Sequence, residues 1–194
     1  MQLCIWSHPQ IISVQDTIGD CDLQVGWRIG DHSDIGLDPS GRPRFITDLR
    51  RHLIGEGELR GAPAVSLQKM QRAGNPWGLP AQERLTWAEG LNIPTVQDNP
   101  GFDVLYWVGC SAAYDRRTMK VARAVAQLLQ RAEVNFAVLG PEERCTGESA
   151  RRMGDEFLFQ ELAVTNIETF TRHNVKKIVT HCPHCLNSLR QDYP

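Results

Sequence analysis

The chain of 194 residues is 41% hydrophobic and 23% charged, the composition of an ordinary globular protein with one domain and an extension, or with two small domains. Its formal net charge of −2 provides no overall field for nucleic acid or anionic lipid, so neither is an expected partner. No stretch approaches the roughly 20 apolar residues of a membrane helix, so no direct membrane span is expected.

The first residues lack the basic region and the long apolar core of a signal peptide. We therefore expect a cytoplasmic protein, which a partner could hold at the inner face of the membrane. A reducing compartment disfavours disulfides, so the six cysteines are better explained as metal or redox ligands.

Regular patterns in the N-terminal half begin near residue 44. Residues 1–44 are rich in turn formers and predict an irregular segment with at most short strands. A helix is predicted over 44–54, and shorter helical pieces over 64–72 and 83–89. The expected organisation has three parts: an irregular N-terminal segment (1–44), a helical linker region (45–100) and a cysteine-rich domain (101–194).

Short apolar runs alternate with helical patterns from residue 101 onward. Three β-rich runs predict buried strands at 104–108, 134–139 and 177–180. Between them, residues 118–132 and 148–172 repeat apolar side chains at helical spacing. This order predicts an α/β fold in the C-terminal half, a parallel β-sheet with crossover helices (β-α-β-α-β), preceded by a helical and irregular N-terminal segment.

Four cysteines follow the three predicted strands. Cys110 comes after the first strand, Cys145 after the second, and the pair Cys182 and Cys185 after the third. We expect these sulfurs to meet, because the carboxyl ends of parallel strands share one edge, where open α/β sheets bind ligands. The two-residue spacer in the pair lets neighbouring thiolates bind one metal centre. Four soft sulfurs suit an iron–sulfur cluster or zinc, and this chemistry alone does not separate the two.

Two other uses of cysteine compete with a metal centre. Free cysteines are common small core residues, and this explanation is favoured for Cys4 and Cys21, which have no patterned neighbours. A thioredoxin-like redox pair also uses the Cys-X-X-Cys spacing, but that motif opens a helix after the first strand of its fold. It would leave Cys110 and Cys145 without a role.

Charged and histidine side chains near the cysteines have two interpretations. Four arginines would offset the negative charge of a thiolate-ligated cluster, and solvated helix ends explain them equally well: Arg116, Arg117, Arg151 and Arg152. His181 and His184 flank the cysteine pair and are expected to hydrogen-bond around the metal rather than bind it.

Four further residues are expected to have structural roles. Asp115 precedes a predicted helix and is expected to be its N-cap. Gly147 is expected to let the chain turn tightly without a Cβ clash. Tyr106 and Trp107 lie on the first strand and are expected to pack in the core rather than to relay electrons.

Four segments resemble a known family: Gly109-Cys110, Glu143-Arg144-Cys145-Thr146-Gly147-Glu148, Ala150-Arg151-Arg152-Met153-Gly154 and Thr180-His181-Cys182-Pro183-His184-Cys185. Together they are similar to the cysteine-rich domain of the heterodisulfide-reductase-related iron–sulfur oxidoreductases. The similarity covers residues 101–194 and extends more weakly to about residue 45. It implies binding of a four-iron, four-sulfur cluster, in some members a non-cubane one, by the four cysteines.

The sequence departs from the family pattern at its middle element. That element is Cys-Cys-Gly in the family and Cys145-Thr146-Gly147 in this chain, so one thiolate is absent and a four-thiolate site is the simpler interpretation. Members usually carry two copies of the domain, and larger members also have a ferredoxin-type cysteine run. This sequence has one copy, and residues 1–100 contain only Cys4 and Cys21.

These observations favour an iron–sulfur electron-transfer protein that is a subunit or fragment of a heterodisulfide-reductase-like oxidoreductase. Its expected partners are other subunits of a redox complex, flavoprotein or quinone-linked. The alternatives are a structural zinc-binding assembly domain and a non-functional truncated remnant. Zinc is colourless and redox-silent, so colour and redox response separate an iron–sulfur protein from a zinc-binding domain. Solubility without metal identifies the truncated remnant.

Overall fold

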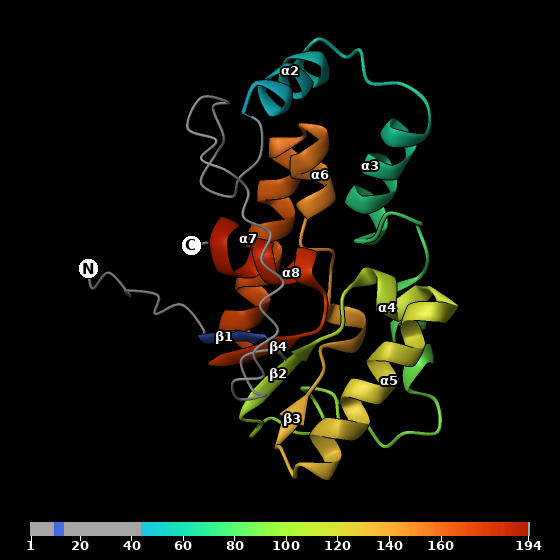
Figure 1. Cartoon of the computed structure of the whole chain (residues 1–194), viewed down its shortest axis with the longest axis vertical. Coiled ribbons are helices and arrows are strands. Elements are labelled where there is room, and N and C mark those ends of the chain that lie inside the picture. The colour runs from blue at the N-terminus through green and yellow to red at the C-terminus, as the bar shows by residue number, and fades with distance from the viewer. Residues whose placement is uncertain (1–9, 14–43, 194) are drawn as a thin grey trace, which may run out of the picture.

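The computed structural model describes residues 10–13 and 44–193, in which four strands form one parallel sheet (Figure 1). In spatial order the strands are β1 (Gln10–Ser13), β4 (Lys177–Thr180), β2 (Val104–Trp107) and β3 (Phe136–Ala137). Every neighbouring pair is parallel. The predicted α/β fold with crossover helices is confirmed, and β1 adds a fourth strand at one edge.

The central strand β2 packs side chains on both faces of the sheet. Tyr106 points to one face, where its ring lies 6.0 Å from that of Trp87. Leu105 and Trp107 point to the other face, where Trp107 lies 5.6 Å from the Phe170 ring. All three β2 side chains are fully buried, so the predicted core role of Tyr106 and Trp107 is confirmed.

The strand β3 is shorter than the 134–139 run predicted. Only Phe136 and Ala137 pair with β2, and Val138 instead bridges to Thr95. The Val138 N–H donates to the Pro94 carbonyl at 3.0 Å, so the chain leaves β2 and pairs with this loop. Apolar, β-rich residues make a segment prone to form a strand, but they do not determine which segment it pairs with. For Val138 the partner is the loop of residues 94–96.

The first crossover helix, α5 (Arg116–Arg131), confirms the amphipathic helix expected over 118–132. Asp115 accepts hydrogen bonds from the Arg117 and Thr118 N–H groups, so its predicted N-cap role is also confirmed. Four other short helical pieces follow strands or connect helices: α4 (Cys110–Tyr114), η3 (Gly140–Glu142), α8 (Pro183–Asn187) and the π-helical turn η4 (Ser188–Asp192).

The single helix predicted over 148–172 is wrong, because two helices occupy this region. α6 (Glu148–Met153) ends at Gly154, and α7 (Glu156–Arg172) begins after the N-cap Asp155. Gly154 has φ 99°, and a Cβ atom there would come within 2.5 Å of the Arg50 carbonyl carbon. The close approach of another backbone and the left-handed conformation both require glycine, and they interrupt the helix.

Helices from residues 44–88 pack against the helices that flank the cysteine loops. α2 (Arg44–Gly55) packs beside α6, and α3 (Ala62–Ala73) contacts α7 (Figure 1). The 3₁₀-helix η2 (Ala81–Ala88) packs against α4 and α5. All three confirm predicted helical pieces. The division of the chain into three parts stays a prediction.

Several large apolar side chains of the described residues are exposed, and Phe157 is the most exposed of them. Phe157, in the first turn of α7, is 87% exposed, whereas its neighbour Leu158 is buried. In the described part of the chain, no helix has the length and apolar character that crossing a membrane requires.

Candidate metal centre

Cys110 stands where β2 meets α4, and the backbone in front of it is tightly held. The N–H groups of Val108 and Gly109 donate to the Glu143 carboxylate at 3.0 and 2.8 Å. Gly109 has φ 80°, and a Cβ atom on it would lie 3.2 Å from the Cys185 sulfur. Glycine therefore lets the backbone pass close to a second cysteine.

Cys182 and Cys185 follow the end of β4. Cys182 is the N-cap of α8, and its N–H donates to the Thr180 hydroxyl at 3.2 Å. Pro183 occupies the first turn of α8, where its missing N–H costs no helical hydrogen bond. Cys185 lies one turn further along and is buried. The strand end and the helix start thus place both sulfurs on the same side of the sheet edge.

Cys145 lies in the loop between η3 and α6, eight residues after β3 ends. Its N–H donates to the Gly74 carbonyl at 2.7 Å, and its carbonyl accepts from the Asn166 side-chain amide at 3.1 Å. Gly147, with φ 81°, allows the turn into α6, and a Cβ there would lie 3.0 Å from Phe159. The backbone role predicted for Gly147 is therefore confirmed.

The C-terminal end of the described chain also holds the Cys145 loop. The Tyr193 hydroxyl donates to the Thr146 carbonyl at 3.1 Å and accepts from the Asn166 amide at 3.0 Å. Asn166 is fully buried on α7. This network joins α7, the C-terminal end and the Cys145 loop.

One cavity of about 380 Å³ is lined by all four cysteines that the sequence placed at the strand ends: Cys110, Cys145, Cys182 and Cys185. Their convergence follows from the parallel topology. All four are free of disulfides. Within residues 10–13 and 44–193, no three histidine, cysteine, aspartate or glutamate side chains are grouped as ligands of a single ion. Cys4 and Cys21 lie outside the described residues.

The four thiols form two hydrogen-bonded pairs with opposite pKa shifts. A hydrogen bond from Cys145 lowers the pKa of Cys110, and this bond together with burial raises the pKa of Cys145. A hydrogen bond from Cys185 lowers the pKa of Cys182 to about 5, and raises the pKa of Cys185. Each pair favours one thiolate, which is the form of cysteine that binds metal.

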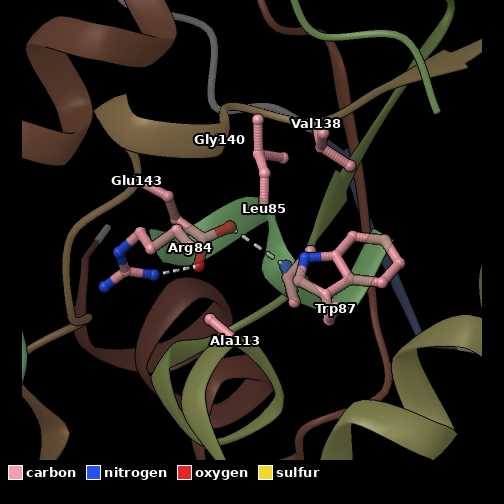
Figure 2. A pocket seen from close by; sticks show the side chains of 8 residues that line it. Arg84, Leu85, Trp87, Ala113, Val138, Gly140 and Glu143 are labelled. Atoms are coloured by element: carbon pink, nitrogen blue, oxygen red, sulfur yellow. Dashed lines mark hydrogen bonds and ion pairs between the residues drawn. The ribbon is translucent and has the colours of Figure 1, made fainter. Parts of the chain in front are cut away.

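A buried ion pair that the sequence analysis missed lies behind Cys110. Arg84 on η2 donates to the Glu143 carboxylate at 2.9 Å, and both side chains are only 2% exposed. Figure 2 shows the two groups facing each other beside Leu85 and Trp87. Arg84 also donates to the Cys110 sulfur at 3.1 Å. Burial lowers the pKa of Arg84, but Cys110 and Glu143 outweigh it, so the guanidinium stays charged.

The arginines proposed from the sequence have other surroundings. Arg152 lines the cavity and pairs with Glu148 at 3.2 Å. Arg151 stacks on the Phe159 ring at 5.0 Å. Arg116 and Arg117 begin α5 and are not among the residues that line the cavity.

The two histidines beside the cysteine pair differ in their positions. His184 lines the cavity with the cysteines. The ring of His181 is hydrogen-bonded to the Tyr106 hydroxyl at 2.9 Å, and burial lowers the pKa of His181. This contact points the His181 ring at the core of the sheet.

The donor set of this cavity is chemically distinctive. Four sulfurs line it together with the apolar side chains of Trp77 and Met153. The carboxylate that also lines it, Glu148, is paired with Arg152. Soft thiolates in partly apolar surroundings suit an iron–sulfur cluster or zinc rather than magnesium or calcium, which prefer oxygen ligands.

Comparison with known proteins gives a family match over the same region. The family model described as "CCG: Cysteine-rich domain" matches residues 104–190, which span all four cysteines. No solved structure shows significant similarity to the chain.

Curated relatives extend the similarity beyond that region. "Probable iron-sulfur-binding oxidoreductase FadF" of Bacillus subtilis is 44% identical over 157 residues, which cover 77% of this chain and 22% of that protein. "EtfAB:quinone oxidoreductase" of Syntrophomonas wolfei is 36% identical over 155 residues, with the same two shares. A dihydromethanophenazine:CoB--CoM heterodisulfide reductase subunit of Methanosarcina barkeri is 30% identical over 123 residues, covering 62% of this chain and 29% of that protein. The chain thus spans between a fifth and a third of these relatives.

Proposed function

We propose that the chain, whose residues 104–190 belong to the cysteine-rich CCG domain family, is an electron-transfer module that binds one iron–sulfur cluster. The observation that carries this proposal is the convergence of four cysteines, from loops far apart in sequence, on one cavity. Cys110, Cys145, Cys182 and Cys185 would each supply one thiolate to the cluster. When bound, such a cluster accepts and donates single electrons.

The cluster that we propose is of the four-iron, four-sulfur type with four thiolate ligands. Thr146 follows Cys145 at the position where the family pattern has a second cysteine, and it lines the cavity. A threonine hydroxyl is a poor ligand for iron in such clusters, which are held by thiolates. Four ligands therefore remain, one for each iron of a cubane cluster.

The protein around the sulfurs has two tasks in this proposal. Cys110, Cys145 and Cys185 are buried, which limits the access of water to the cluster. The Gly74 carbonyl and the Glu143 carboxylate accept hydrogen bonds from the ligand loops, and the Asn166 amide donates one, so the sulfurs are held in place before any metal binds. A prepared set of ligands lowers the cost of ordering the loops on binding.

The donor and the acceptor of electrons lie on other domains or subunits in our proposal. The names of two relatives mention a quinone oxidoreductase and a heterodisulfide reductase. These names support a flavoprotein or quinone-linked redox complex as the setting of this chain. A cytoplasmic location and the three-part organisation (1–44, 45–100 and 101–194) belong to the same proposal.

The test is metal and sulfide analysis of protein purified without oxygen, together with visible and electron paramagnetic resonance spectra. We expect iron and acid-labile sulfide in near-equal amounts, with loss of both in Cys182→Ser and Cys185→Ser. Cys4→Ser and Cys21→Ser are the matched controls, because they remove a thiol that is not a proposed ligand. Zinc without iron would move the function to structural assembly, and absence of any metal would contradict both functions.

A further inference from the structure

Arg84 makes contacts that join three separate parts of the site. Its guanidinium donates to the Glu143 carboxylate at 2.9 Å, to the Gly74 carbonyl at 3.1 Å and to the Cys110 sulfur at 3.1 Å. It also lies over the Tyr114 ring, 5.4 Å from its centre. The planar guanidinium of arginine has several N–H donors and can bind these three acceptors at once, which the single ammonium group of lysine cannot do as well.

Glu143 connects the ion pair to two cysteine loops. Its carboxylate accepts the N–H groups of Val108 and Gly109, directly before Cys110. Glu143 itself stands two residues before Cys145. Burial raises the pKa of Glu143, while Arg84 and the two N–H groups oppose this by stabilising the carboxylate. The Arg84–Glu143 pair, whose side chains Figure 2 shows, therefore fixes the backbone next to Cys110 and Cys145.

The two charges of the pair are arranged unequally around Cys110. The cation contacts the sulfur directly, whereas the carboxylate faces the backbone N–H groups in front of it. In a buried setting the nearer charge dominates, because water does not screen it. The Cys110 sulfur thus experiences a net positive field from the pair.

Stability alone does not explain this arrangement. Burying two charges costs solvation, and a buried ion pair is often replaced by apolar residues with little loss of stability. By contrast, Arg152 at the mouth of the cavity has a side chain that is 49% exposed and paired with Glu148. Solvent screens the charge of Arg152, so Arg84 is the cation that acts on the sulfur.

We propose that Arg84, held by Glu143, is a positioning residue that fixes Cys110 and raises the reduction potential of the bound cluster. Reduction adds one negative charge to the cluster, and a cation in contact with a ligand sulfur stabilises the reduced form more than the oxidised form. This inference rests on the proposed function, since it concerns the same cluster. It also predicts an effect on the backbone that requires no cluster.

Two variants and one control test the proposal in the full-length chain. Arg84→Lys keeps the charge but loses the fork, because a single ammonium cannot serve all three acceptors. The double variant Arg84→Met with Glu143→Gln removes both charges and keeps similar side-chain volumes. Arg131→Gln is the control, since this exposed cation ends α5 and is not among the residues that line the cavity.

The first measurement is the reduction potential of the cluster by a spectroscopic redox titration. We expect the highest potential in the wild type, a lower one in Arg84→Lys, and the lowest in the double variant. Arg131→Gln should match the wild type. A folded, iron-replete Arg84→Lys with an unchanged potential would overturn the proposal, and so would a higher potential in the double variant.

The second measurement is amide hydrogen exchange of Val108 and Gly109 in metal-free protein. We expect exchange roughly fivefold to tenfold faster in the double variant, because a neutral acceptor replaces a carboxylate. Unchanged exchange would show that the pair does not position Cys110. If the wild type binds no iron, the proposed function fails and this measurement alone decides the positioning role. If the double variant does not fold, Arg84→Lys decides both points, the second by faster exchange of the same two amides, because without the fork of Arg84 the Glu143 carboxylate that accepts them is held less firmly.

Discussion

Replacing Gly154 by alanine tests the close packing of α2 against the turn between α6 and α7. Gly154 has φ 99°, a conformation that costs an L-residue about 1–2 kcal/mol. In addition, an alanine Cβ would lie 2.5 Å from the Arg50 carbonyl carbon and 2.7 Å from the Arg51 nitrogen. These atoms belong to backbone, which cannot rotate away, so overpacking adds about 1–3 kcal/mol.

The matched control for this substitution is Gly90→Ala. Gly90 has φ 74°, but nothing lies within 4 Å of the position where its Cβ would be. The Gly90→Ala variant therefore has the conformational cost of about 1–2 kcal/mol but no clash of the added Cβ atom. We expect Gly154→Ala to lower the free energy of unfolding by about 2–5 kcal/mol.

Urea unfolding followed by circular dichroism measures both free energies of unfolding. The informative quantity is the difference between the two variants, because the conformational cost is common to both. An equal loss of stability in Gly154→Ala and Gly90→Ala would refute the close approach of α2 to this turn. It would also leave the left-handed conformation of Gly154 as the one remaining reason for the break between α6 and α7.

Three further substitutions have expected outcomes. Asp115→Ala should lower the melting temperature of the protein. Hydrogen bonds from Thr118 lower the pKa of Asp115 in the folded state, so the ionised carboxylate stabilises the fold. The difference in melting temperature between wild type and variant should therefore be full above pH 3.8 and shrink as the pH falls below it. Glu143→Leu should cost about 3–5 kcal/mol in urea unfolding by leaving Arg84 without its carboxylate, whereas adding Arg84→Met should recover only part of that loss, because the Val108 and Gly109 N–H groups still lack their acceptor. Tyr193→Phe should cost about 1 kcal/mol in the same assay through its lost hydrogen bonds, and iron should dissociate faster on treatment with a chelator.

Local patterns predicted those parts of the fold that depend on local chemistry. The apolar spacing of α5 and the capping side chain of Asp115 were both evident from the sequence, and both are confirmed. The family resemblance drawn from the cysteine segments is confirmed by the match over residues 104–190. The convergence of the cysteines was predictable in a different way, because parallel strands with helical crossovers bring their carboxyl ends to one edge.

Features that depend on a distant partner were not predicted. β1 is defined by its pairing with β4, far along the chain, and its four residues have no strong pattern of their own. β3 is cut short by a loop that competes for Val138. Gly154 was a weak local signal for a helix end, but the close approach of Arg50 that requires glycine there is a tertiary contact.

Arg84 shows that the cation in contact with a cysteine sulfur is not a neighbour of that cysteine along the chain. The arginines proposed from the sequence were neighbours of the cysteines along the chain, where exposed helix ends are common. Arg84 lies 26 positions before Cys110 and 59 before Glu143, in a segment predicted to be a linker. A buried cation must be paired and hydrogen-bonded, and the acceptors of Arg84 come from three segments that meet only in the folded chain. A charge that would act on the proposed cluster is therefore to be expected among the buried residues of the fold, and Arg84 is such a residue.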